Sequence, residues 1–222
     1  KLGDKGPDGA AYSSIVVSNA GKTKQYVQLV GKGIVSVRAS DGKFLWNYNK
    51  ITNGTAAIPT PIVRDDYVFC SSGYSDGGAA LLKIVKDGAD LRADEVWYKK
   101  ADELQNHHGG VVLLGDYLYM GHGHNRGLPV CVNFLTGEPT WGPSRGPGGD
   151  SAAIVYADGH LYFRYQNGVM ALIEANPKEL QVKGKFDVKS KDGPGWPHPV
   201  VLDGRLYLRD QQNLHCYNVK KS

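Results

Sequence analysis

The sequence predicts an all-β protein, a β-propeller built from four-stranded antiparallel blades. Short apolar runs are separated by Gly, Asp and Asn, which is typical of strands and turns rather than helices. One such unit recurs along the chain at intervals of about 45 residues, the spacing of a propeller blade. The 29 glycines and 13 tyrosines also favour a turn-rich β-protein.

The clearest copy of the unit spans residues 106–141 and predicts four strands. GGVVLL is followed by a Gly115-Asp116 turn and YLYMG, and the loop HGHNRG leads into LPVCVNF. The turn Leu135–Glu138 then leads into a strand that carries Trp141. Each run is four to seven residues long, which is too short for a typical helix.

The second strand of each copy identifies five repeats. It reads Tyr26-Val27-Gln28, Tyr67-Val68-Phe69, Tyr117-Leu118-Tyr119, Leu161-Tyr162-Phe163 and Leu206-Tyr207-Leu208. Asp and Gly precede four of these strands, and both residues tolerate the positive φ angles of tight hairpins. We expect repeats at about 12–50, 56–100, 107–143, 150–188 and 196–219, all within one propeller region of residues 1–222.

An aromatic residue recurs in the fourth strand. Trp46 follows Gly42 by four residues, and Trp141 follows Gly137 by the same step. The second copy lengthens this step and ends at Trp97, and the fourth copy is predicted to place Phe186 at this position. We expect these rings to pack between neighbouring blades.

The two ends of the chain predict that it is part of a longer propeller. The last copy reaches Ser222 without a fourth strand, and propellers usually close with a strand from the other end because an open edge invites aggregation. The N-terminal KLGDKGPDGAA is rich in Gly, Pro and charge and is not predicted to be that strand. We therefore expect the C-terminal part of a propeller with about seven or eight blades.

Bulk properties exclude several classes of function. The net charge of +4 is spread over the chain, which does not favour nucleic-acid binding. No apolar run approaches the roughly 18 residues of a membrane span, and no signal peptide is visible. Cys70, Cys131 and Cys216 each lie in an apolar strand and are predicted to be buried free thiols. No phosphate-binding loop or nucleophile elbow is present.

With its Gly-x-x-x-Trp turns and Tyr-Val/Leu-Tyr strands, the sequence resembles the PQQ-like β-propeller family over residues 12–219. That family includes quinoprotein alcohol dehydrogenases and outer-membrane assembly lipoproteins. GHGHNRG, SAAIVYADGHLYFRYQNGVMALIEA and WPHPVVLDGRLYLRDQ are similar to uncharacterised exported members of planctomycete type. The resemblance implies a periplasmic or extracellular location, and for the dehydrogenases PQQ with calcium. The isolated cysteines depart from the adjacent pair of those enzymes.

Four histidines form the sharpest candidate site. His107 and His108 precede a first strand, and His122 and His124 lie between a second and a third strand, two places that open on the same face of a propeller. Neutral imidazole binds zinc, copper or iron, so the pattern predicts a transition-metal site. The alternatives are an organic or anionic ligand, and histidines that only cap strand ends and bond loop backbone.

Arginines and other polar residues on the same face form a second candidate site. Arg164 and Arg209 each follow a second strand, and two guanidinium groups there favour a carboxylate or phosphate ligand. The alternative is that they bridge to Asp150, Asp210 or loop carbonyls. The remaining candidates for ligand or cofactor binding are Asn125, Arg126, Trp196, His198 and Asp210.

These features favour a non-catalytic function. We expect an exported binding or scaffold module that holds a protein partner or a small anionic ligand at its His- and Arg-rich rim. The alternative is a PQQ-dependent oxidoreductase of the alcohol dehydrogenase type, whose site is completed by blades upstream of Lys1. A bound chromophore or a stoichiometric metal would distinguish the two.

Overall fold

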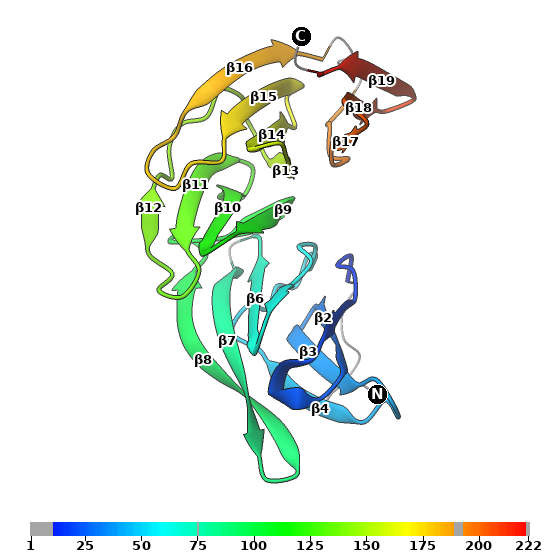
Figure 1. The fold of residues 1–222 in the computed structure, drawn as a ribbon, viewed down its shortest axis with the longest axis vertical. Coiled ribbons are helices and arrows are strands. Elements are labelled where there is room, and N and C mark those ends of the chain that lie inside the picture. The colour runs from blue at the N-terminus through cyan, green and yellow to red at the C-terminus, as the bar shows by residue number, and fades with distance from the viewer. Residues whose placement is uncertain (1–10, 75, 189–192, 221–222) are drawn as a thin grey trace. The chain divides into compact units, whose positions relative to one another are not determined.

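The computed structural model describes residues 11–74, 76–188 and 193–220. Within them, five antiparallel sheets and one short 3₁₀ turn make up the regular structure (Figure 1). Four sheets have four strands and the last has three, each in simple up-and-down order. The predicted all-β fold class is confirmed. The N-terminal stretch that the sequence excluded as a closing strand lies almost wholly outside the described residues.

The first two sheets follow one another in the chain. The first sheet contains β1 (Val16–Ser18), β2 (Gln25–Val30), β3 (Gly33–Arg38) and β4 (Phe44–Tyr48), with the 3₁₀ turn Ala20–Lys22 after β1. The second contains β5 (Ile62–Arg64), β6 (Tyr67–Ser72), β7 (Gly78–Asp87) and β8 (Asp90–Lys100). The residues inserted between Gly88 and Trp97 lengthen the β7–β8 hairpin.

Three further sheets complete the described chain. The third contains β9 (Asn106–Leu114), β10 (Tyr117–His122), β11 (Leu128–Asn133) and β12 (Pro139–Trp141). The fourth contains β13 (Ala152–Ala157), β14 (His160–Tyr165), β15 (Val169–Glu174) and β16 (Val182–Asp187). The fifth contains β17 (Val200–Leu202), β18 (Arg205–Asp210) and β19 (Asn213–Asn218).

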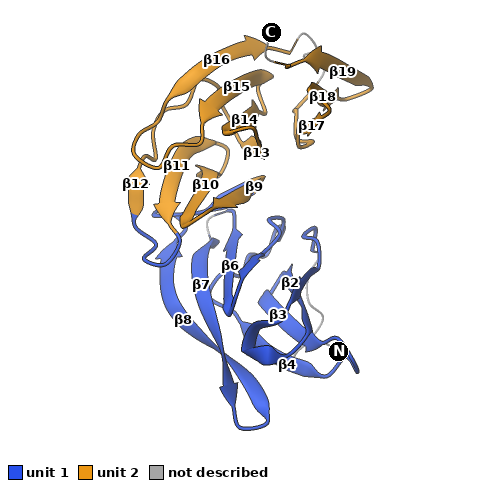
Figure 2. Cartoon of the chain, in the orientation of Figure 1, with its two compact units in different colours: residues 1–107, 134–138 blue, residues 108–133, 139–222 orange. Residues whose placement is uncertain are grey.

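The chain divides into two compact units (Figure 2). Unit 1 holds residues 1–107 and 134–138, and unit 2 holds residues 108–133 and 139–222. In unit 1, Val27 and Leu29 of the first sheet bury against Val68 and Cys70 of the second. Unit 2 has two such cores. Tyr119 packs with Phe163 in one of them, and Met170 packs with Leu206 in the other.

Two-residue turns set the register of the second strands. Asp65, Asp158 and Asp203 have positive φ angles, as the predicted hairpins require. The strands that follow begin at Tyr67, His160 and Arg205. In the fourth and fifth sheets the strand therefore starts one residue before the predicted Leu161 and Leu206. Because side chains alternate between faces, this register decides which residues meet the next sheet.

The fifth and sixth positions of the second strand follow from this register and face opposite sides of the sheet. Ser71, Gly121, Arg164 and Arg209 occupy the fifth position, and Ser72, His122, Tyr165 and Asp210 occupy the sixth. Fifth-position side chains face the following sheet, as the contact of Arg164 with Asp210 shows within unit 2. The sixth-position side chains of Ser72 and Asp210 face the preceding sheet of their own unit, where they meet the Ile51 carbonyl and Arg164.

The pairing between the third and fourth strands skips one residue of the fourth strand next to each tryptophan. Trp46 pairs with Ser36, Trp97 with Leu81 and Trp141 with Cys131, and in each case the next pair omits one residue of the fourth strand. The indoles of Trp97 and Trp141 donate to the carbonyl oxygens of Phe134 and Asn176 at 2.9 and 2.7 Å. Each acceptor follows the third strand of the next sheet.

The assignment of Phe186 to this tryptophan position is wrong. In the fourth sheet, Leu172 pairs with Gly184, and the next pair joins Ile173 to Val182, which omits Lys183. Gly184 therefore occupies the tryptophan position, and Phe186 lies two residues further along, opposite Met170. The turn before β16 carries no Gly to mark the step, so the sequence offers only the nearest aromatic residue as a guide.

We expect Trp97→Ala to lower the free energy of unfolding by about 3–5 kcal/mol, because it removes a buried ring and its hydrogen bond. Phe186→Ala should cost no more than about 2 kcal/mol, since that side chain is 38% exposed. Urea unfolding followed by circular dichroism measures both. Equal losses in the two variants would contradict the assignment of Gly184 to the tryptophan position.

Candidate functional site

A buried ion pair joins the fourth and fifth sheets inside unit 2. Arg164, the fifth residue of β14, and Asp210, the last residue of β18, are both buried. Nη2 of Arg164 donates to Oδ1 of Asp210 at 3.2 Å. Burial lowers the pKa of the guanidinium, and the charge of Asp210 opposes that shift. The guanidinium keeps its charge, because an arginine pKa lies far above neutral pH.

The ion pair is incompletely satisfied. Among the described residues, Nε and Nη1 of Arg164 and Oδ2 of Asp210 have no hydrogen-bond partner. A buried charge that lacks hydrogen bonds is costly, so each partner depends strongly on the other. The pair therefore makes the interface between these two sheets sensitive to any loss of charge.

Gly195 covers the guanidinium. A Cβ atom on this glycine would lie 2.6 Å from Nη2 of Arg164, so a larger residue would displace the arginine. The Gly195 amide donates to the carbonyl oxygen of Gln166 at 3.2 Å. This backbone contact holds the loop before β17 against the loop after β14. Neither Gly195 nor Gly184 was singled out from the sequence, because a glycine in a loop or on a sheet edge carries no chemical signal.

Next to this loop lies a group of aromatic and polar residues that we call the Trp196 cluster: His108, Gln166, Trp196 and His198. The Trp196 indole donates to Oε1 of Gln166 at 2.8 Å, and its ring lies 6.0 Å from that of His108. Nε2 of His198 lies 3.2 Å from the carbonyl oxygen of His108. Trp196 is 55% exposed, so the cluster presents a wide aromatic surface held by hydrogen bonds.

The surroundings of His108 lower the pKa of its imidazole. Burial lowers its pKa, and the nearby imidazole of His198 lowers it further, while a hydrogen bond to Gln166 opposes the shift. The neutral form is therefore favoured at neutral pH. A neutral imidazole beside an indole adds to an apolar, hydrogen-bonding surface rather than to a cationic one.

The two arginines of the predicted pair differ in environment. Arg164 is covered by the fifth sheet, whereas Arg209 is exposed and its Nε donates to the carbonyl oxygen of Gln211 at 3.2 Å. Arg209 points to the other face of the fifth sheet, where the described residues of unit 2 include no further sheet. Equivalent positions in the repeat therefore have different partners, because Arg164 pairs with a carboxylate of the next sheet and Arg209 donates to a loop carbonyl.

Asn125 and Arg126 lie in the loop between β10 and β11. The Ser151 hydroxyl donates to Oδ1 of Asn125 at 3.2 Å. The backbone carbonyl of Ser151 accepts from the backbone N–H of Gln166 at 2.8 Å. Asn125 is thus linked through Ser151 to the Trp196 cluster. Arg126 is exposed and its stem lies over Gly123.

The four predicted metal-binding histidines belong to both compact units. His107 belongs to unit 1, where its ring meets the edge of Tyr74 at 4.9 Å. His108, His122 and His124 belong to unit 2, and His122 is buried. No group of three or more His, Cys, Asp or Glu side chains that could hold a metal ion occurs in the part of the chain that the structure describes. The metal site stays a prediction.

Calcium, which accompanies PQQ in the dehydrogenases of the resemblance, takes about six to eight oxygen ligands. No group of three or more His, Cys, Asp or Glu side chains that could hold such an ion occurs among the described residues. Cys70 and Cys131 are buried free thiols in different sheets, as predicted, and form no adjacent pair. The predicted burial of Cys216 is wrong, because this thiol is exposed in the three-stranded fifth sheet. Arg164, one of the two arginines predicted to bind an anion, is already paired with Asp210.

Comparison with known protein families identifies the family of this chain. A family model described as outer membrane protein assembly factor BamB matches residues 3–143. The chain belongs to this family. The match confirms the resemblance of this BamB-family chain to PQQ-like propellers. A comparison with curated proteins found no match.

Two solved structures have the same fold as this BamB-family chain. BamB from Moraxella catarrhalis matches with a TM-score of 0.63 at 15% identity, over 97% of this chain and 60% of that chain. The computationally designed Ika8 protein matches with a TM-score of 0.61 at 8% identity, over 93% of this chain and 59% of that chain. The chain therefore spans about 60% of the length of these proteins. No helix among the described residues has the length and apolar character for crossing a membrane.

We expect Asp210→Ala to lower the free energy of unfolding by about 3–5 kcal/mol, because it leaves the Arg164 guanidinium buried without a counter-charge. The double variant Arg164→Met, Asp210→Leu should lose less than Asp210→Ala alone. Arg209→Ala, at the equivalent exposed position, should change stability by about 0.5 kcal/mol at most. Urea denaturation measures all three. The single variants Arg164→Met and Asp210→Leu are measured in the same way. If their losses of free energy add up to the loss in the double variant, the two residues do not interact.

We expect His108 to titrate below the usual histidine value of about 6.5. The unfolded chain then binds the proton first, so stability falls as the pH drops from about 7 through the pKa of folded His108. An NMR titration gives this pKa, and His198→Ala should raise it because it removes a neighbouring imidazole. His108→Gln should flatten the loss of stability between about pH 7 and 5. A pKa of 6.5 or more in the folded protein would contradict the burial of this imidazole.

Proposed function

We propose that this chain is a binding and scaffold module that holds a polypeptide partner at the Trp196 cluster. The observation that carries the proposal is the exposure of Trp196. Its side chain is 55% exposed, whereas Trp46 and Trp97 are buried in the sheet interfaces. Tryptophan is enriched among the few residues that supply most of the energy of protein interfaces.

The hydrogen bond from Trp196 to Gln166 supports this function. It holds the indole in one orientation before a partner arrives, so less side-chain entropy is lost on binding. Gly195, directly before Trp196, is seated on the buried guanidinium of Arg164. The exposed ring is thus held beside the interface between the fourth and fifth sheets. A binding residue needs such support from the residues around it.

A polypeptide fits this surface better than a small anion. The guanidinium of Arg164 is buried and already faces Asp210, and the pKa of His108 is lowered, so neither group supplies free positive charge at neutral pH. The exposed groups are an indole, imidazole rings and amides, which suit backbone hydrogen bonds and apolar side chains. Arg209, Asn125 and Arg126 would then contact the partner at the edge of the surface.

The family description supports the same class of function. The matching family is described as an outer membrane protein assembly factor. For this chain we propose a location on the periplasmic side of an outer membrane and an extended polypeptide as its partner. The quinoprotein oxidoreductase remains the alternative prediction, and no contact among the described residues favours it.

The test uses an unfolded outer-membrane β-barrel protein, diluted from urea, as the probe. We expect it to bind the wild-type chain and to protect Trp196 from acrylamide quenching. Trp196→Ala should weaken binding at least about tenfold, as for a central interface residue. Tyr156→Ala is the matched control, because Tyr156 is an aromatic residue of unit 2 that is 41% exposed on β13. Equal affinity of wild type and Trp196→Ala would refute the proposal.

A further inference from the structure

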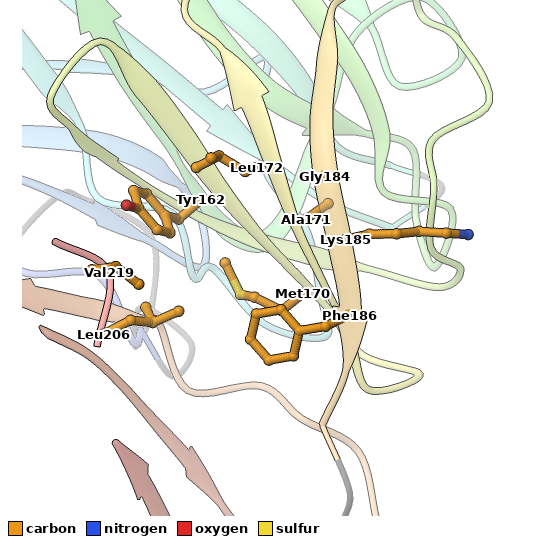
Figure 3. A pocket seen from close by; sticks show the side chains of 9 residues that line it. All are labelled: Tyr162, Met170, Ala171, Leu172, Gly184, Lys185, Phe186, Leu206 and Val219. Atoms are coloured by element: carbon orange, nitrogen blue, oxygen red, sulfur yellow. The ribbon is translucent and has the colours of Figure 1, made fainter. Parts of the chain in front are cut away.

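The interface between the fourth and fifth sheets contains a cavity of about 330 Å³ in unit 2 (Figure 3). Its walls come from β14, β15 and β16 on one side and from Leu206 and Val219 on the other. The lining is mainly apolar. The cavity lies away from the Trp196 cluster, and no residue of that cluster lines it.

The cavity exists because a tryptophan is missing. In the register of the fourth strand, Gly184 occupies the position of Trp46, Trp97 and Trp141. The ring that faces the indole is retained. Phe69 lies 5.9 Å from Trp97 and Tyr119 lies 6.2 Å from Trp141, each from the third position of a second strand. Tyr162 occupies that third position in the fourth sheet and lines the cavity.

Gly184 is not required by the backbone. Its φ angle lies outside the left-handed region, and a Cβ atom at this position would meet no heavy atom within 4 Å. By contrast, a Cβ on Gly137, beside Trp97, would lie 2.7 Å from the indole. The space beside Gly184 is therefore open to an added group, and nothing among the described residues fills it.

We propose that this cavity binds an uncharged, planar aromatic small molecule of about the size of indole. Its volume lies at the lower end of the range for ligand pockets, about 300–1,000 Å³. Tyr162 and Phe186 offer aromatic faces, and the Met170 sulfur offers a polarizable contact that also favours aromatic rings. Figure 3 shows the side chains of Tyr162, Met170, Phe186, Leu206 and Val219 around the same space.

The chemistry of the lining selects against a charged ligand and in favour of an edge N–H group. Lys185 is the one charged residue of the lining, and its side chain extends away from the others (Figure 3). Trp97 and Trp141 donate from Nε1 to backbone carbonyls that follow the third strand of the next sheet. In the fifth sheet the corresponding segment begins at Val219, which lines the cavity. A ligand with a ring N–H can make the bond that the missing tryptophan would make.

The test compares the binding of indole to the full chain and to variants at position 184. Saturation-transfer NMR and calorimetry should show that indole binds the wild type with a Kd of about 1 mM or tighter, as suits a ligand of this size. Gly184→Ala, the matched control, should bind equally well because a methyl group leaves most of the space open. Gly184→Trp should not bind indole, and its Tm should rise by about 2–4 °C or more because its own ring fills the cavity.

A second variant keeps the proposal testable if Gly184→Trp does not fold. Phe186→Ala removes one aromatic wall and is tolerated at a side chain that is 38% exposed, so it should weaken indole binding at least about fivefold. Absence of binding to the wild type at about 5 mM indole would overturn the proposal. Unchanged binding in both Gly184→Trp and Phe186→Ala would place indole elsewhere and also overturn it. Binding of a tryptophan-containing peptide without binding of free indole would assign the cavity to a partner's side chain instead.

Discussion

Packing of one sheet face against the next is the constraint on which the rest of this structure depends. Each sheet carries apolar side chains that an isolated sheet of three or four short strands cannot bury by itself. Within each unit, the second strand presents its odd positions to the following sheet and its even positions to the preceding one. The fourth-strand tryptophan adds a hydrogen bond across the same interface at Trp97 and Trp141. A single skipped residue turns the indole toward that interface.

The same alternation carries polar groups into the interface between the fourth and fifth sheets. The fifth position of the second strand is Ser71 in the second sheet, Gly121 in the third and Arg164 in the fourth. A guanidinium is tolerated there only because the sixth position of the next strand is Asp210. The pair fixes the loop that carries Gly195, and that loop presents Trp196. An ion pair that adds little net stability can thus determine where an exposed binding residue lies.

The fourth sheet combines two departures from the repeat. Arg164 is a charged residue at the fifth position of its second strand, and Gly184 stands in place of the fourth-strand tryptophan. Both departures fall on the face that meets the fifth sheet. Met170, Leu206 and Leu208 form buried apolar contacts that stabilise this interface. The interface therefore contains open space beside Gly184, which is compatible with a role in binding rather than in stability alone.

Strands, turns and repeat period follow from local chemistry and are visible in the sequence. Asp158 and Asp203 adopt the positive φ angles that their two-residue turns require, and alternating apolar residues then define the strands. The sequence offered Asp210, 46 residues from Arg164, only as one of several possible partners, because no local pattern selects among them. The register of the fourth strand depends on a skipped residue, and the sequence therefore suggested Phe186 where the structure has Gly184. The sequence by itself determined the propeller fold because hairpins are local. Only the tertiary structure decided the buried ion pair, the support of Trp196 and the cavity beside Gly184, because each depends on contacts between sheets.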